Sequence, residues 1–202
     1  YEISCSLVGS EMCIRDRKGV PASLFMAITR SLFRTLSQHV LSPAKIVTEM
    51  NNSISDNNES NMFVTLIVGI LDLETGILKL CNAGHNPPIL IYPDGQVSYL
   101  EFKTQIFVGV VEDFKYSDEE VVLEKESKLF LYTDGVTEAE NINKELYGEE
   151  KLLEMLSDNA SSDVRTTVNV VVDSIASHVK EAEASDDLTI LLIQYEPGTA
   201  NS

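Results

Sequence analysis

The sequence predicts an α+β domain in which helix pairs flank antiparallel sheets. Two stretches with helical periodicity, 21–40 and 43–54, come before a run of short strand-like segments, and two more, 149–156 and 163–179, come in its C-terminal part. The strand-like segments return after turns of a few residues, which is typical of antiparallel hairpins. Helices grouped in pairs around such strands indicate a layered α+β domain and not a doubly wound parallel sheet.

The size and charge of the chain narrow the classes of protein and partner. Its 202 residues, 44% of them hydrophobic, are enough for one packed domain. With 15 basic and 32 acidic residues the formal net charge is -17, which argues against nucleic acid and anionic membrane as partners. The longest apolar run, 62–71, is too short to span a bilayer, so we expect no membrane insertion.

The cysteines indicate a reducing compartment. The chain has three, and their spacing fits neither a metal site nor a disulfide framework. We therefore expect a cytoplasmic protein. The cysteines are Cys5, Cys13 and Cys81.

Three of the predicted helices have apolar residues at steps of three and four, which would bury one face. In the second helix, Ser42 followed by Pro43 is typical of an N-cap with proline at the first helical position. The predicted apolar faces are Leu24, Phe25, Ile28, Leu32, Leu36 and Val40 in the first helix, Ile46, Val47, Met50 and Ile54 in the second, and Val164, Val168, Val171, Ile175 and Val179 in the last.

The predicted strands are short and are separated by turn residues. An Asp-Gly turn at 94–95 and a turn at 72–76 separate neighbouring strands. The predicted strands are 62–71, 77–82, 89–92, 97–101, 121–123, 128–132 and 188–193. The last of them is apolar except for Thr189, which indicates a buried strand.

Residues 1–17 stand apart from the rest of the chain. They show neither an amphipathic helix nor an alternating strand, and they join abruptly to the patterned sequence that starts at Lys18. The stretch LVGSEMCIRDR at 7–17 resembles translated sequencing-adapter read-through, so we interpret 1–17 as a non-native segment. The alternative is a divergent N-terminal arm.

Asp134 has the sharpest local context for chemistry. It follows the predicted buried strand 128–132 in the sequence LFLYTDGVTE at 129–138. The sheet would hold a carboxylate rigidly at this point, with its oxygens toward an opening, as a metal ligand requires. The alternative is that Asp134 and Gly135 only turn the chain.

Asp186 and Asp187 form a second acidic cluster, at the start of the last predicted strand. If that strand is antiparallel to 128–132, these residues and Asp134 fall at the same edge of the sheet. Carboxylates brought together across about 50 residues repel one another unless a cation compensates them, and oxygen clusters suit magnesium or manganese. The alternative is that they only solvate the start of the strand.

The segment CNAGHNPP at 81–88 predicts a stiff loop between two strands. His85 fits a general acid or a phosphate contact, but we favour a structural role in which its ring bonds nearby backbone. In this interpretation Gly84, His85, Pro87 and Pro88 form a structural loop, with the two prolines fixing the turn.

Four segments together resemble the PPM-type protein serine/threonine phosphatases of the SpoIIE/RsbU-like branch. They are KGVPASLFMA at 18–27, NAGHNPP at 82–88, YTDGVTE at 132–138 and DDLT at 186–189. Their order and spacing fit together, and the resemblance extends over 18–195, leaving 196–202 as a C-terminal tail. It implies a four-layer α-β-β-α sandwich whose first strands lie upstream of this sequence, so that the domain is N-terminally truncated.

The resemblance also implies a site with two manganese or magnesium ions. By position, Asp134 and Asp186 correspond to metal ligands and catalytic residues, and Asp187 to a neighbour that acts through water. Gly19 lies directly after the family's first ligand loop and is assigned to the same site.

The chain departs from the family at that first ligand loop. The family pattern resembles Gly-Asp-Val-Ser-Gly before the Lys-Gly pair, whereas this sequence has CIRDR at 13–17. Ile14 therefore stands where a bridging aspartate is expected, and Asp16 is displaced and flanked by Arg15 and Arg17. A bridging carboxylate holds two ions together, so we expect the chain as written to be impaired.

The function that the resemblance implies is hydrolysis of phosphoserine or phosphothreonine on a small bacterial regulatory protein, such as an anti-anti-sigma factor. An upstream sensor domain would fit this role. The alternative is a non-catalytic, pseudophosphatase-like binding module in bacterial signalling. A native Gly-Asp before Lys18 would indicate the enzyme, and a non-acidic residue there would indicate the binding module.

Overall fold

The computed structural model describes residues 2–9, 20–39, 42–56, 58, 61–182 and 187–197. They form two compact units, each built from two separate stretches of the chain. The first unit comprises Tyr1–His85 and Phe102–Val122, and the second Asn86–Glu101 and Leu123–Ser202. No helix in these described ranges has the length and apolar character needed to cross a membrane.

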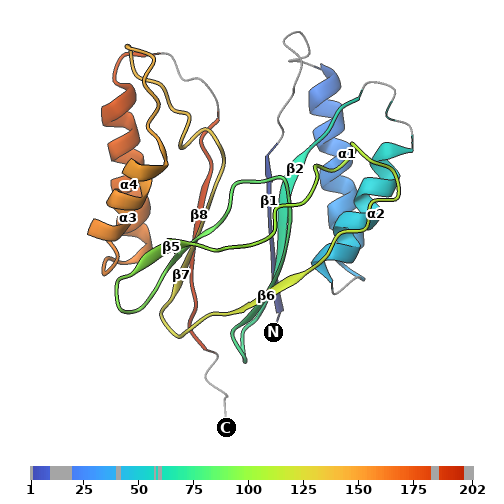
Figure 1. Cartoon of the computed structure of the whole chain (residues 1–202), viewed down its shortest axis with the longest axis horizontal. Helices are drawn as coiled ribbons and strands as arrows, with labels where there is room; N and C mark the ends of the chain where they lie inside the picture. Colours follow the sequence, from blue (N-terminus) through green and yellow to red (C-terminus); the bar gives the residue numbers. More distant parts are fainter. Residues whose placement is uncertain are drawn as a thin grey trace. The chain divides into compact units, whose positions relative to one another are not determined.

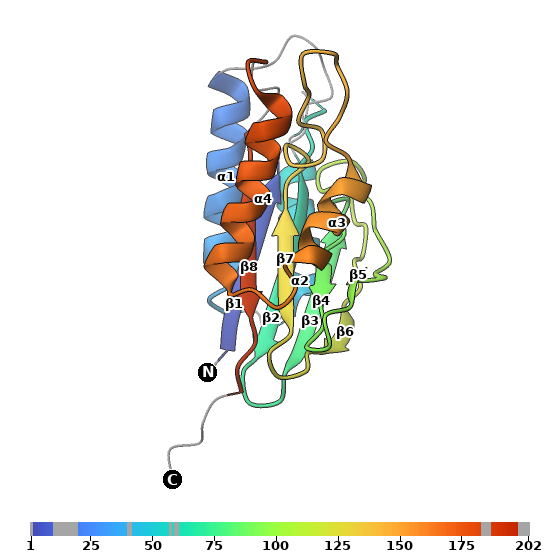
Figure 2. The ribbon, with the colours of Figure 1, turned by 90° about the vertical axis from the view of Figure 1, so that its left-hand side faces the viewer.

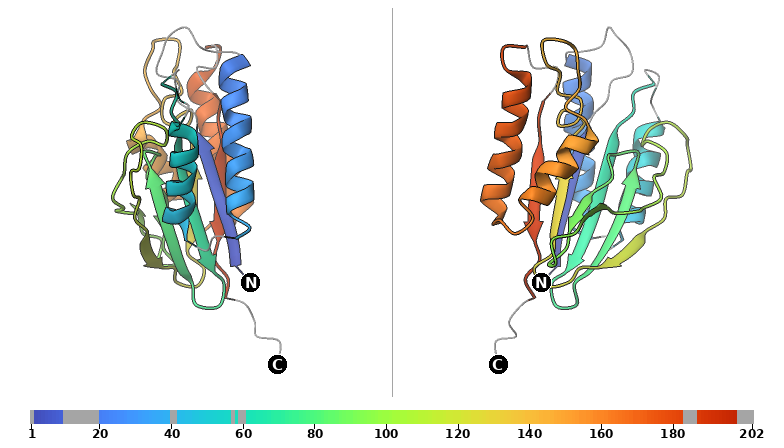
Figure 3. Two further views of the ribbon diagram at one scale, coloured as in Figure 1. Left: turned by 90° about the vertical axis from the view of Figure 1, so that its right-hand side faces the viewer. Right: turned by 60° about the vertical axis from the view of Figure 1, so that its left-hand side comes forward.

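The first unit contains a four-stranded antiparallel sheet with the order β1-β2-β3-β6. Two helices lie on one face of this sheet (Figure 1 and Figure 3, left). Its strands are β1 (Glu2–Gly9), β2 (Thr65–Asp72), β3 (Ile77–Ala83) and β6 (Glu119–Val122), and its helices are α1 (Val20–Leu36) and α2 (Pro43–Ser55).

The second unit repeats this plan with the strand order β5-β4-β7-β8, again antiparallel. Helices α3 and α4 cover one face of this sheet (Figure 2). Its strands are β4 (Ile89–Ile91), β5 (Val97–Tyr99), β7 (Lys128–Tyr132) and β8 (Ile190–Gln194), and its helices are α3 (Glu149–Asp158) and α4 (Val164–Val179). Antiparallel sheets with helix pairs, as found in the described residues, confirm the predicted α+β fold class.

Helix α2 forms as its sequence predicts. Ser42 is the N-cap, its side chain accepts a hydrogen bond from the Lys45 amide, and Pro43 begins the helix. The four predicted apolar residues of this helix are all buried in the core of the first unit. The Asp118 carboxylate adds a second cap, accepting hydrogen bonds from the Ser42 hydroxyl and the Ala44 amide.

Helix α1 presents a different face from the one predicted. Leu24 and Ile28 are 61% and 47% exposed, whereas Phe25 and Thr29 are buried. The helix tolerates a buried threonine because the Thr29 hydroxyl donates to the Phe25 carbonyl at 2.9 Å. The predicted stripe was therefore wrong at Leu24 and Ile28; Val40 lies outside the described residues.

Strand β1 is the other departure, because we found no strand pattern in 1–17. Its backbone pairs with β2 over its whole length, from Glu2 opposite Asp72 to Gly9 opposite Thr65. The ladder with β2 supplies the backbone hydrogen bonds, and such pairing does not require an alternating pattern. The interpretation of 1–17 as a non-native segment stays a prediction.

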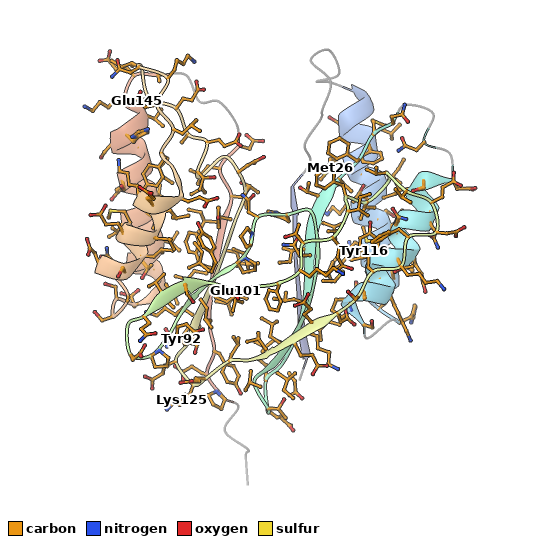
Figure 4. The ribbon with its side chains drawn as sticks, viewed as in Figure 1. Met26, Tyr92, Glu101, Tyr116, Lys125 and Glu145 are labelled. Atoms are coloured by element: carbon orange, nitrogen blue, oxygen red, sulfur yellow. The ribbon has the colours of Figure 1, made fainter. Side chains whose placement is uncertain are left out.

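A long loop, 102–118, completes the first unit. Tyr116 lies beside α2 (labelled in Figure 4), where its amide donates to the Thr48 hydroxyl at 3.2 Å and its ring packs edge-on against Phe114. Buried Asn51 holds the same loop by accepting from the Gly109 amide at 2.9 Å and donating to the Val111 carbonyl at 2.8 Å. The loop is thus fixed to α2 by side-chain hydrogen bonds.

In the second unit, Lys128 ties β7 to the connection between α3 and α4. Its side chain is buried, and its ammonium group donates to the carbonyls of Ala160 at 2.7 Å and Ser162 at 2.5 Å. Burial lowers the pKa of Lys128, and the nearby Asp163 carboxylate opposes this shift. The Asp163 side chain also caps α4 by accepting from the Arg165 and Thr166 amides.

Candidate functional site

Asp134 lies just beyond the end of β7. All five residues of this strand are buried, and the carboxylate of Asp134 is half-buried. Its Oδ1 accepts a hydrogen bond from the Gly135 amide at 2.9 Å, and the Asp134 carbonyl accepts from the Glu138 amide at 2.8 Å. The Asp-Gly pair therefore does turn the chain, and the carboxylate retains oxygen lone pairs for a further partner.

The start of the last strand runs beside this turn. Strand β8 pairs antiparallel with β7, with Tyr132 opposite Ile190. One step beyond that pair, the Thr133 amide donates to the Thr189 carbonyl at 3.1 Å. The Thr133 hydroxyl accepts from the Thr189 amide at 3.1 Å and donates to the Asp187 carbonyl at 3.3 Å.

Gly135 allows the closest approach of the two segments. A β-carbon on Gly135 would lie 2.4 Å from the carbonyl oxygen of Asp187, far inside van der Waals contact. Only glycine fits between the turn and the incoming strand here. The structure thus brings the backbone of Asp187, whose side chain is exposed, against the residue that follows Asp134.

Two of the predicted metal-site residues, Asp186 and Gly19, lie outside the described residues. The expected proximity of Asp134 and Asp186 stays a prediction. The structure shows the antiparallel pairing of β7 with β8 on which that prediction depended. It also describes Asp187, the residue that follows Asp186 in the chain.

The loop at 82–88 is held from within. The Asn82 side chain donates to the His85 carbonyl at 2.9 Å and accepts from the His85 amide at 2.8 Å, and both residues are buried. Gly84 has a φ of +78°, and a β-carbon on it would lie 1.9 Å from the Phe107 ring. Further along, the Pro88 carbonyl accepts from the Leu100 amide at 2.9 Å, and Pro87 is half-buried. These contacts use the backbone of His85 and not its ring, so the structural role of the ring stays a prediction.

Tyr132, the last residue of β7, contributes no acid or base at neutral pH. It is buried, and burial is the main cause that raises its pKa, with the neighbouring Tyr99 adding to the shift. The phenol therefore stays protonated under physiological conditions.

The donor chemistry of the Asp134 and Asp187 carboxylates fits a hard divalent cation. Asp134 and Asp187 offer anionic oxygens, which magnesium and manganese prefer. Within the described ranges, however, no three His, Cys, Asp or Glu side chains gather into a group that could hold a metal ion. The described residues alone thus hold no complete group of metal ligands.

The sequence analysis missed the hydroxyl of Thr133. Thr133 is 8% exposed and bonds both Asp187 and Thr189, yet we had considered it only as part of a motif. The sequence signal for this role is a hydroxyl residue between an apolar strand and an Asp-Gly pair. Which groups that hydroxyl can bond depends on the strand that pairs alongside.

Comparison with known proteins gives a consistent picture. The sequence pattern of the family described as "Stage II sporulation protein E (SpoIIE)" matches residues 18–196. The chain is 24% identical to "Phosphoserine phosphatase RsbU" of Bacillus subtilis over 178 residues, which cover 88% of this chain and 52% of that protein. It is 25% identical to "Protein IcfG" of Synechocystis over 203 residues, covering 87% of this chain and 32% of that protein.

Solved structures show the same fold. The SiaA-PP2C domain of Pseudomonas aeruginosa superposes with a TM-score of 0.80 at 19% identity, covering 97% of this chain and 80% of that one. RsbX in complex with magnesium gives a TM-score of 0.67 at 18% identity, covering 96% of this chain and 81% of that one.

The chain spans between about a third and about half of the curated relatives, 32% of IcfG and 52% of RsbU. The family match, in contrast, covers most of this chain. The fold agrees with this match, because the chain has two antiparallel sheets, their helix pairs and the paired turn at Asp134. This chain therefore belongs to the SpoIIE family, the SpoIIE/RsbU-like branch of the PPM-type phosphatase domains.

Proposed function

We propose that this domain is a metal-dependent protein serine/threonine phosphatase. The observation that carries the proposal is the antiparallel pairing of β7 with β8, which sets the Asp134 turn against the backbone of Asp187. Membership of the SpoIIE family supports it, as does the likeness to RsbU and RsbP, both named phosphoserine phosphatases. The substrate we propose is a phosphorylated regulatory protein of the anti-anti-sigma kind.

The residues of the second unit proposed to hold manganese or magnesium are Asp134 and Asp186, with Asp187 contacting an ion through water. Two such ions, when bound, supply an activated water for attack on phosphorus and positive charge opposite the phosphoryl oxygens. The protein's part is to hold these carboxylates in place. The Gly135 amide fixes one oxygen of Asp134, and the β7–β8 ladder fixes the backbone that carries Asp187.

The chain as written is proposed to be impaired. Ile14 has no side-chain oxygen with which to ligate an ion, and Arg15 and Arg17 add positive charge to the same stretch of sequence. Asp134, Asp186 and Asp187 are proposed to retain one ion weakly, because water can complete its coordination. One ion cannot act as a two-metal clamp.

The decisive experiment replaces 13–17 by Gly-Asp-Val-Ser-Gly and measures manganese-dependent hydrolysis of a phosphoserine peptide. We expect turnover in the replaced protein and little in the chain as written. Adding Asp134→Asn should then lower turnover by more than about 100-fold, beyond what loss of a group that only supports a metal ligand costs. Asp173→Asn, the same change on an exposed carboxylate of α4, is the matched control and should leave turnover unchanged. Near-normal turnover of the Asp134→Asn protein at saturating manganese would refute the assignment.

A binding module is the second candidate, and one observation favours it. Ile14 stands at the position of the bridging aspartate. A binding module would bind the phosphorylated partner more tightly than its unphosphorylated form, without manganese and without releasing phosphate. Measuring phosphate release beside binding of the same phosphopeptide separates the two functions.

A further inference from the structure

The hydrogen-bond ladder between β7 and β8 ends with a bond to a side chain. At Thr133 the backbone carbonyl is already used by the turn, because it accepts from the Val136 amide at 3.0 Å. The next amide of the partner strand, that of Thr189, therefore finds the Thr133 hydroxyl as its acceptor at 3.1 Å. The hydroxyl takes over the place of the carbonyl and extends the pairing by one step.

The same hydroxyl also reaches the acidic segment. It donates to the Asp187 carbonyl at 3.3 Å, so its single proton is directed to Asp187 while its lone pairs face Thr189. Thr133 is 8% exposed, which limits competition from water for these bonds. Thr133 is thus bonded to both ends of the Asp187–Thr189 segment and is covalently linked to Asp134.

We propose that Thr133 is a positioning residue: its hydroxyl holds the Asp187–Thr189 segment beside Asp134, and so sets the affinity of the site for a divalent cation. This inference rests on the proposed function. Thr133 itself contacts neither cation nor substrate. Carboxylates on a segment free to move would lose affinity because a cation would have to order them on binding.

Three variants test this. Thr133→Val keeps the shape and the β-branch but removes the hydroxyl, whereas Thr133→Ser keeps the hydroxyl. Thr167→Val is the matched control, because Thr167 is also buried in the second unit and its hydroxyl bonds the Asp163 carbonyl at 3.0 Å within α4. Each variant is made in the 202-residue chain.

The first measurement is hydrogen exchange of the Thr189 amide without metal. Thr133→Val should speed this exchange by about tenfold, the factor that corresponds to loss of one buried hydrogen bond. Thr133→Ser and Thr167→Val should leave it unchanged. Unchanged exchange in Thr133→Val would overturn the proposal, whatever the metal does.

The second measurement is Mn²⁺ binding, followed through the electron paramagnetic resonance signal of free Mn²⁺, which detects weak sites. Thr133→Val should weaken binding by about 10-fold or more, as losses around metal ligands do. Thr133→Ser should restore it, and Thr167→Val should match wild type. Equal affinity in wild type and Thr133→Val, or equal weakening in Thr167→Val, would overturn the positioning role while leaving the proposed function intact. Absence of any Mn²⁺ binding in wild type would refute the metal site and the inference with it.

Discussion

The α-carbon of Gly135 faces the carbonyl oxygen of Asp187 so closely that a β-carbon would lie 2.4 Å from it. The Asp187 carbonyl belongs to the backbone just ahead of β8, so it cannot rotate away as a side chain can. This fixes how near the Asp134 turn and the last strand lie. The closeness of this approach can be tested by comparing two Gly→Ala variants.

Gly135→Ala should destabilise the domain by about 1–3 kcal/mol, the usual cost of forcing extra volume into a packed site. Gly69→Ala is the comparison, because a β-carbon there would lie 2.7 Å from the end of the flexible Leu80 side chain. Urea unfolding should show the smaller loss for Gly69→Ala. The reverse order would mean that the approach of Gly135 to Asp187 is looser than described.

Lys128→Met should cost about 1–3 kcal/mol, because it leaves the carbonyls of Ala160 and Ser162 without their donor. Lys125→Met is the control: Lys125 pairs with Glu126, and these side chains are 63% and 58% exposed. An exposed pair of this kind contributes about 0–1 kcal/mol. Equal urea midpoints for the two variants would contradict a structural role for the buried ammonium group.

Asp118→Ala should weaken the start of α2 by about 1 kcal/mol, because the Ala44 amide and the Ser42 hydroxyl lose their acceptor. Glu120→Ala removes a carboxylate from the same part of the chain, but its partner Lys79 is largely exposed. We expect a lower thermal midpoint for Asp118→Ala than for Glu120→Ala. Identical midpoints would show that Ser42 alone suffices as the cap.

Cys81 predicts a dependence of stability on alkaline pH. Burial, aided by the Asp118 charge, raises the pKa of the Cys81 thiol to about 12, and the hydrogen bond from Gln105 opposes this shift. The folded state therefore keeps the thiol protonated where the unfolded chain releases its proton. The stability that the thiol contributes is complete below the unfolded pKa of about 8.5 and is lost as pH rises toward the folded value.

The measurement compares wild type with Cys81→Ala. Between pH 8 and 10, the free energy of unfolding of wild type should fall by about 2 kcal/mol more than that of Cys81→Ala, at up to about 1.4 kcal/mol per pH unit. Other titrating groups, including Cys5 and Cys13, are common to both proteins and cancel. Parallel pH profiles would show that the thiol titrates with an ordinary pKa.

How far sequence predicts structure differs between elements of this chain. Helix α2 and strand β7 were predictable because their signals are local: an N-cap with proline, and an apolar run that ends at Asp-Gly. Strand β8 was placed too early, at 188 instead of Ile190, because Leu188 continues the apolar run although it is 40% exposed. Its burial also differs from the prediction, since Leu192 is its only buried residue.

The failures have a common physical origin in tertiary contacts. Periodicity gives an apolar stripe on α1 but does not say which edge of the stripe meets the core, and the edge with Phe25 does so while Leu24 stays exposed. Strand β1 owes its backbone hydrogen bonds to β2, whose paired residues lie between 56 positions (Gly9 and Thr65) and 70 positions (Glu2 and Asp72) along the chain. The hydrogen bond from the Thr133 hydroxyl to the Asp187 carbonyl likewise joins residues 54 positions apart in the chain.

The division of each unit into two separate stretches of chain has a consequence for how the protein is made. The hairpin β4–β5 leaves the ribosome before β6, the strand that finishes the first sheet, and must wait for β7 and β8 before its own sheet can form. Neither unit is a contiguous fragment, so a stalled or cleaved chain ending between β5 and β6 would leave one sheet short of a strand and the other with only its first hairpin. Such intermediates expose strand edges that favour aggregation. A chain that terminates at this stage of synthesis therefore exposes unpaired strand edges. The second sheet is complete only when β8, the strand that follows Asp187, has been synthesised.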